Sequence, residues 1–269
     1  MRVGLTLPQF RDDADEAFAT AHRAEELGLD GVFVFDHLWP IGRPDGPALQ
    51  SRVLLGALAV EMSRVVLGPL VARVSLLANA VLAHEMETLY RMLGDRLIVG
   101  LGTGDSLSRA ENERAGVPFL SVAERVADLE DCCRRLRAVG ISTWVGGHAA
   151  RVRSAAAHEA DGWNGWSAGA HDFAADAVDV LERAAAAGRR VEVTWGGQVL
   201  IGRTTAEAAA KLEQYGHRAG LVHGTVDDLR RHFAALAALG VTWAVCAPLD
   251  IGTGSDAVEM VAEARDLHG

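Results

Sequence analysis

The chain has 269 residues, of which 49% are hydrophobic, and its formal net charge is −10. This content is enough for a large core, and the acidic residues spread along the chain argue against nucleic acid or an anionic membrane surface as the partner. No segment reaches the ~20 apolar residues that a membrane-spanning helix needs, and the N-terminus has no signal-peptide pattern. We therefore expect a cytoplasmic protein whose partner is a small-molecule substrate.

Apolar strand-like runs alternate with segments of helical periodicity along the whole chain. We expect strands at 3–7, 31–36, 64–74, 96–101, 141–145, 162–166, 191–201 and 241–247. Helices are expected at 12–27, 48–62, 79–93, 121–139, 151–160, 172–187, 204–214 and 226–239. Eight β/α units at this length predict an α/β protein with one (β/α)8 TIM-barrel domain over residues 1–269. An open doubly wound sheet is the alternative fold.

The second predicted strand ends abruptly in charged residues, because the apolar run Val32 to Phe35 is followed directly by Asp36 and His37. In parallel α/β sheets, ligands bind beyond the carboxyl ends of the strands. A purely structural role, with Asp36 capping a turn, is the alternative. On a barrel, one rim would also carry Gln9, Trp39, 70–75, 102–105, 146–148, 163–166, Gln198 and Asp250.

Two glycine turns follow the fourth and fifth predicted strands. Gly102-Thr103-Gly104 would allow the backbone to approach a flat ring closely; the alternative is a simple turn at the rim. A dinucleotide-binding fingerprint is not indicated, because it would need a further glycine and a helix that are missing here. Gly146-Gly147 precedes a helix, whose unpaired amides attract phosphate.

Metal and Schiff-base chemistry are not expected. No histidines or carboxylates have metal-ligand spacing, and Cys132, Cys133 and Cys246 are expected to be reduced structural thiols. Lys211, the only lysine, lies in a helical stretch rather than at a strand end.

Six segments in order resemble the luciferase-like monooxygenase superfamily. They are 24–37, 67–71, 80–83, 94–104, 144–147 and 160–164. The superfamily includes bacterial luciferase relatives that use FMN and oxidoreductases that use the deazaflavin coenzyme F420. Asp-His at the second strand and Gly-Pro-x-Val at the third favour the F420 branch.

The resemblance implies roles for individual residues. His37 would lie beside the reactive ring as acid or base, with Asp36 at the cofactor edge, and a non-prolyl cis peptide at Leu70–Val71 would support the ring. The catalytic set is completed by Asp105, where relatives carry Glu. The implied cofactor-binding residues are Leu70, Val71, Ala72, Gly102, Thr103, Gly104, Gly146, Gly147 and His148, and the implied walls of the substrate pocket are Trp39 and Trp166.

Three departures from the family pattern stand out. The side chain of Asp105 is about one methylene shorter than the Glu of relatives. Relatives carry a longer lid insertion between the fourth helix and the fifth strand, whereas here residues 133–140 lead almost directly to Ile141. Phosphate contacts that lysine makes in some relatives must come from arginine or backbone amides.

The function that the resemblance implies is hydride transfer between F420 and a small organic substrate. An FMN-dependent monooxygenase and a non-catalytic cofactor-binding relative are the alternatives. The substrate and the oligomeric state, with a homodimer among the options, are left open by the sequence.

Overall fold

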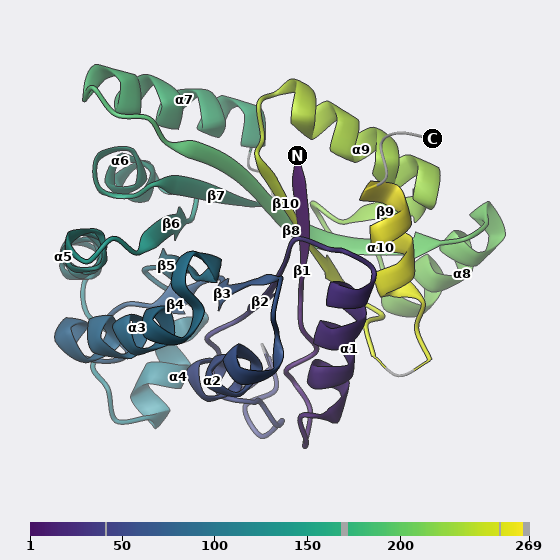
Figure 1. The fold of residues 1–269 in the computed structure, drawn as a ribbon, viewed down its shortest axis with the longest axis horizontal. Helices are drawn as coiled ribbons and strands as arrows, with labels where there is room; N and C mark the ends of the chain where they lie inside the picture. The colour runs from purple at the N-terminus through teal and green to yellow at the C-terminus, as the bar shows by residue number, and fades with distance from the viewer. Residues whose placement is uncertain (41, 168–171, 253, 266–269) are drawn as a thin grey trace.

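The computed structural model describes residues 1–40, 42–167, 172–252 and 254–265. Parallel strands form a central barrel, and the helices lie outside it (Figure 1). The strands are β1 (Arg2–Thr6), β2 (Gly31–Val34), β3 (Val66–Pro69), β4 (Ala72–Arg73), β5 (Ile98–Gly102), β6 (Ser142–Gly146), β7 (Gly162–Ser167), β8 (Glu192–Gly202), β9 (Val222–Thr225) and β10 (Trp243–Pro248). The helices are α1 (Asp15–Glu26), α2 (Ser51–Glu61), α3 (Asn79–Leu93), the short η1 (Gly94–Arg96), α4 (Ser108–Arg114), α5 (Val122–Ala138), α6 (Ala150–Glu159), α7 (Phe173–Ala186), α8 (Thr205–Tyr215), α9 (Val226–Ala238) and α10 (Ala257–Arg265).

The sheet closes on itself in chain order. β1 pairs in parallel with both β2 and β10, and β10 pairs with β8, from which the order runs through β7 and β6 to β5. If β3 and β4 are taken as one strand, eight strands surround the barrel within the described ranges, and β9 adds to the outer end of β8. This confirms the predicted (β/α)8 barrel and excludes the open doubly wound sheet.

The third barrel strand is interrupted, although the sequence predicts it as continuous over 64–74. β3 pairs with β2 and β4 pairs with β5. Between them the Leu70–Val71 peptide bond is cis, as the family resemblance implies. The interruption therefore lies where the strand passes from one neighbour to the other.

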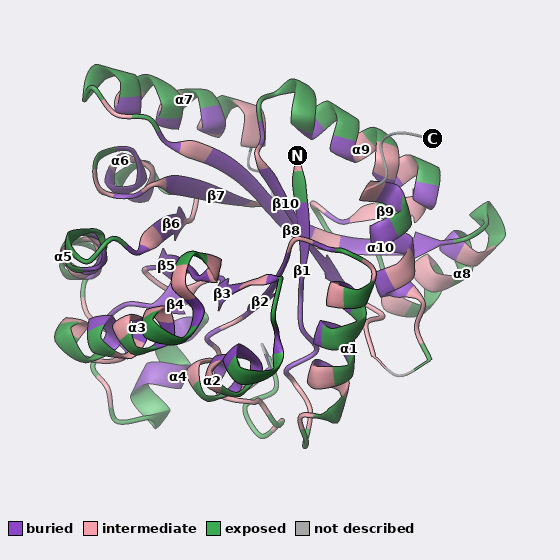
Figure 2. Ribbon diagram, in the orientation of Figure 1, coloured by how far each residue is buried: buried purple, intermediate pink, exposed green. Residues whose placement is uncertain are grey.

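The barrel strands are largely buried on both faces, unlike β9, whereas the helices bury one side and expose the other (Figure 2). On β2, Val32 and Val34 belong to the large cluster that includes helix residues, and Phe33 lies in a separate cluster with Trp144 and Trp243. The Phe33 ring is 5.7 Å from Trp144 and 5.8 Å from Trp243 between centroids. Because neighbours on a strand point to opposite faces, these aromatic rings fill the inside of the barrel.

The structure contains elements that the sequence analysis does not predict, namely α4, β9, α10 and η1. α4 has no apolar stripe to reveal it, because the residues that it buries are Ser108, Glu111 and Asn112. The passage from α5 to β6 takes only residues 139–141, in agreement with the expected shortening of the lid insertion. Among the helices described, none is both long and apolar enough to cross a membrane.

Candidate active site

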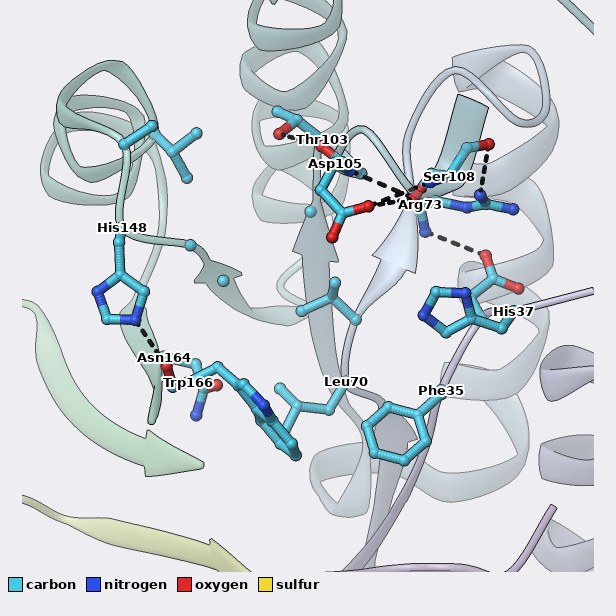
Figure 3. Close-up of a pocket in the computed structure, with 18 of the residues that line it drawn as sticks. Phe35, His37, Leu70, Arg73, Thr103, Asp105, Ser108, His148, Asn164 and Trp166 are labelled. Atoms are coloured by element: carbon cyan, nitrogen blue, oxygen red, sulfur yellow. Dashed lines mark hydrogen bonds between the residues drawn. The ribbon is translucent and has the colours of Figure 1, made fainter. Parts of the chain in front are cut away.

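A cavity of about 500 Å³ opens at the carboxyl ends of the barrel strands. Most of the predicted site residues lie in its wall: Asp36, His37, Leu70, Val71, Gly102, Thr103, Gly104, Asp105, Gly146, Gly147, His148 and Trp166. The wall also contains Phe10, Phe35, Arg73, Ser108, Ala149, Val152, Asn164 and Gln198. Figure 3 shows His37 and His148 on opposite sides of this cavity.

Two predicted site residues lie outside the wall. Ala72 is buried in β4, where it pairs with Leu101. The Trp39 ring lies under the Arg114 guanidinium at 5.4 Å from its centroid, so α4 holds the indole away from the cavity. The structure therefore does not place Trp39 with Trp166.

His37 is held by a carboxylate that the sequence analysis does not identify. Its Nδ1 is 2.9 Å from Oε1 of Glu111, whose side chain is only 3% exposed. The other oxygen, Oε2, is 2.8 Å from Nη2 of Arg73. An ionised carboxylate only accepts, so Nδ1 carries the proton, and Nε2 points toward the cavity (Figure 3).

Asp36 joins three elements rather than offering a free carboxylate. Oδ1 accepts from Ser51 Oγ at 2.8 Å, and Arg52 Nη1 is 3.0 Å from both oxygens. Oδ2 also accepts from the Arg73 amide at 3.0 Å. The buried charge is thus neutralised by Arg52, and the end of β2 is tied to α2 and β4.

Asp105 lies where the Gly-Thr-Gly turn enters α4. Its Oδ1 accepts hydrogen bonds from the Leu107 amide at 2.9 Å and the Ser108 amide at 3.1 Å. The carboxylate thus holds the turn that leads into α4. The carboxylate also faces the cavity (Figure 3).

The two glycine turns lie against the Val71 side chain. A Cβ on Gly102 would lie 2.4 Å from Val71 Cγ2, and one on Gly146 would lie 2.7 Å from Val71 Cγ1. Both positions therefore require glycine because of this close approach. On the far side of the turn, Arg125 Nη1 donates to the carbonyls of Thr103 and Gly104 at 2.8 and 2.9 Å.

The start of α6 provides the amides that the sequence suggests for a phosphate. In the described chain, the N–H groups of Ala149, Ala150 and Arg151 make no hydrogen bond. His148 turns both ring nitrogens to acceptors, with Nδ1 2.6 Å from Asp176 Oδ2 and Nε2 2.7 Å from the Trp166 carbonyl. These two contacts hold the ring in place beside the free amides at the start of α6.

Lysine, cysteine and metal chemistry find no support elsewhere in the described structure. Burial alone would lower the pKa of Lys211, but Asp250 and Glu207 raise it above the usual value, which is opposite to the requirement of a Schiff-base lysine. Burial raises the pKa of Cys132 to about 12, which makes it unreactive. Among the described residues, no three His, Cys, Asp or Glu side chains are grouped to hold a metal.

A parallel barrel with a histidine-bearing cavity at its carboxyl rim is a fold that many enzyme classes share. The family model for luciferase-like monooxygenase matches residues 1–140, and the chain belongs to this family.

Curated relatives and solved structures agree with this membership. An F420-dependent glucose-6-phosphate dehydrogenase of Kineococcus radiotolerans is 40% identical over 119 residues, which are 44% of this chain and only 34% of that relative. An F420-dependent secondary alcohol dehydrogenase, solved with an F420-acetone adduct, superposes with a TM-score of 0.83 at 14% identity over 100% of this chain and 99% of that one. An EDTA monooxygenase from Chelativorans sp. reaches a TM-score of 0.80 at 12% identity, over 98% and 92% of the two chains. The two structures establish the shared fold.

Proposed function

We propose that the protein is an oxidoreductase that uses coenzyme F420 and transfers a hydride between it and a small organic substrate. The observation that carries this proposal is the placement of His37 at the mouth of β2, with Nδ1 fixed by Glu111 and Nε2 toward the cavity. The names of the curated relatives support F420 as the cofactor. A cytoplasmic location stays a prediction from the sequence.

The residues of the cavity fit such a cofactor. The Leu70–Val71 peptide and the two glycine turns would support a flat ring, and the α6 amides beside His148 would bind a phosphate. When bound, F420 supplies or accepts the hydride.

His37 accepts or donates the proton that must accompany the hydride, depending on the direction of the reaction. A neutral His37 accepts a proton at Nε2 from a substrate hydroxyl, and a charged His37 donates one to a carbonyl oxygen. Glu111 keeps the ring in one orientation, while Asp105 holds the turn that leads into α4. Asp36 positions the strand end that carries His37.

The FMN-dependent monooxygenase is the second candidate, because the family and its solved members include monooxygenases. The proposal is tested by anaerobic redox turnover of F420 with a panel of alcohols and ketones. His37→Ala is expected to reduce turnover ~100-fold or more with F420 binding intact. Oxygen consumption that requires reduced FMN would favour the monooxygenase instead, and binding without turnover would indicate a non-catalytic relative.

We also propose that the protein forms a homodimer through α2. Val53 and Val60 on its outer face are 73% and 77% exposed, with Ala57 between them on the same stripe. An apolar stripe on an outer helix favours burial against a second copy.

A further inference from the structure

The cavity presents a continuous aromatic wall beside His37. Phe10 stacks on Phe35 at 6.2 Å between centroids, and the edge of Phe35 meets Trp166 at 5.6 Å. Phe10 also lies 6.5 Å from the His37 ring. None of these rings is fully buried, so apolar surface faces the space next to Nε2. Such surface favours the flat or apolar part of a ligand.

The basic side chains in this wall already lie against carboxylates. Glu111 contacts both His37 and Arg73, and Asp176 contacts His148. Within the described wall, these three are the side chains that can carry a positive charge. A substrate phosphate would therefore have to compete with Glu111 or Asp176 for them.

Asp105 adds a negative charge at the same end of the cavity, and no salt bridge is formed by its carboxylate in the described chain. A phosphate monoester carries about −1.5 to −2 at pH 7 and would be repelled there. Lys211 cannot compensate, because its Nζ is bound to the Ile201 carbonyl and Asp250, each at 2.8 Å.

We infer that the substrate is an uncharged molecule with an apolar, flat or ring-shaped body and one hydroxyl or carbonyl oxygen directed to Nε2 of His37. The inference rests on the proposed function, which assigns the α6 amides to the cofactor phosphate. It departs from the sugar phosphate in the names of the curated relatives. A cavity of about 500 Å³ that must also hold the cofactor ring leaves room only for a small substrate.

The test is calorimetric titration of the F420-loaded protein with 2-cyclohexen-1-one and, separately, with glucose 6-phosphate. The enone is expected to bind at least ~10-fold more tightly than the sugar phosphate. Phe10→Leu and Trp166→Leu are each expected to weaken the binding of the enone by ~3- to 10-fold. The matched control is Phe18→Leu on α1, whose side chain packs on the core away from the cavity and should leave enone binding unchanged.

Equal or tighter binding of glucose 6-phosphate would overturn the inference while the proposed function stands, as would binding of neither ligand. A prior titration with F420 alone separates the two claims. If F420 does not bind, the proposed function fails. The affinities of the enone and the sugar phosphate are then compared on the cofactor-free protein. Tighter binding of the sugar phosphate there would contradict the inference.

Discussion

Glu111 shares its two oxygens between His37 and Arg73, and this contact fixes the orientation of the histidine ring. We expect Glu111→Gln to lower turnover ~10- to 100-fold, because the amide presents an N–H group to one of the two donors that the carboxylate accepts from. The measurement is the turnover rate of variant and wild type at the same pH.

The matched control is Glu113→Gln on the same helix. Its side chain is 62% exposed and pairs loosely with Arg109 at 3.8 Å. It should leave turnover unchanged. Unchanged turnover in Glu111→Gln would show that the carboxylate only fills space.

At the scale of single residues, the sequence locates the strand-end histidine but not its partner. His37 follows an apolar run, which is a pattern that indicates a rim position. Glu111 lies in a polar stretch of alternating charges that is typical of a solvated helix, and only the tertiary fold buries it. The need for glycine at position 102 is likewise tertiary, since Val71 approaches it from the junction between β3 and β4.

At the scale of the elements, the end of β6 packs closely against the Val71 side chain, which leaves no room for a side chain at Gly146. Gly146→Ala would place a methyl group 2.7 Å from Val71 Cγ1. Overpacking costs ~1–3 kcal/mol, and because Val71 lines the cavity, we expect cofactor affinity to fall about 10-fold or more. Gly56→Ala in α2 is the control, because its added Cβ meets no atom within 4 Å. If both variants bind the cofactor like wild type, Val71 does not position it.

The contact of α9 with β8 has a pH-sensitive component. The His232 ring packs edge-on against Trp195 at 4.8 Å, and its Nε2 is buried with no hydrogen-bond partner in the described structure. Burial lowers the pKa of His232 in the folded chain, below its unfolded value of ~6.5. The unfolded chain then takes up the proton first, so stability is lost as pH falls from ~6.5 through the lower folded pKa.

We therefore expect His232→Gln to show a smaller loss of unfolding free energy between pH 8 and pH 5.5 than wild type, measured by urea denaturation at both values. An identical loss in the two proteins would assign the acid sensitivity to other groups.

Element prediction succeeds where periodicity is strong and fails where an element is short or polar. α3 begins and ends at the predicted residues, Asn79 and Leu93. α4 and β9 are short, and nothing in their apolar pattern separates them from loops. The division of β3 from β4 is not predicted, because the apolar pattern runs on through it; the family resemblance implies only the cis peptide that lies there.

For the whole molecule, the exposed stripe on α2 predicts the oligomeric state. Wild type is expected to be a dimer in analytical ultracentrifugation, and Val53→Asp with Val60→Asp to be a monomer, because two buried charges would face each other across the interface. Val178→Asp on α7, where the valine is 53% exposed, should stay dimeric. A monomeric wild type would contradict the proposal.

The barrel as a whole could be predicted because alternating strands and helices leave few topologies at this length. The chemistry could not be predicted in the same way, because the cavity combines side chains from most of the strands with a helix that the pattern does not reveal. The hypothesis of an F420 cofactor comes from the family resemblance. The proposal of an uncharged substrate comes from the ion pairs and the aromatic wall of the cavity.

The central claim is most directly tested by equilibrium titration of the cofactor-free protein with F420 and, separately, with FMN, followed by tryptophan fluorescence. Trp166 lies in the cavity wall and Trp163 beside His148, at 5.8 Å between ring centroids, so occupation should quench their emission. We predict saturable binding of F420 at least ~10-fold tighter than binding of FMN. Tighter binding of FMN, or binding of neither, would contradict the assignment of this cavity to a deazaflavin oxidoreductase.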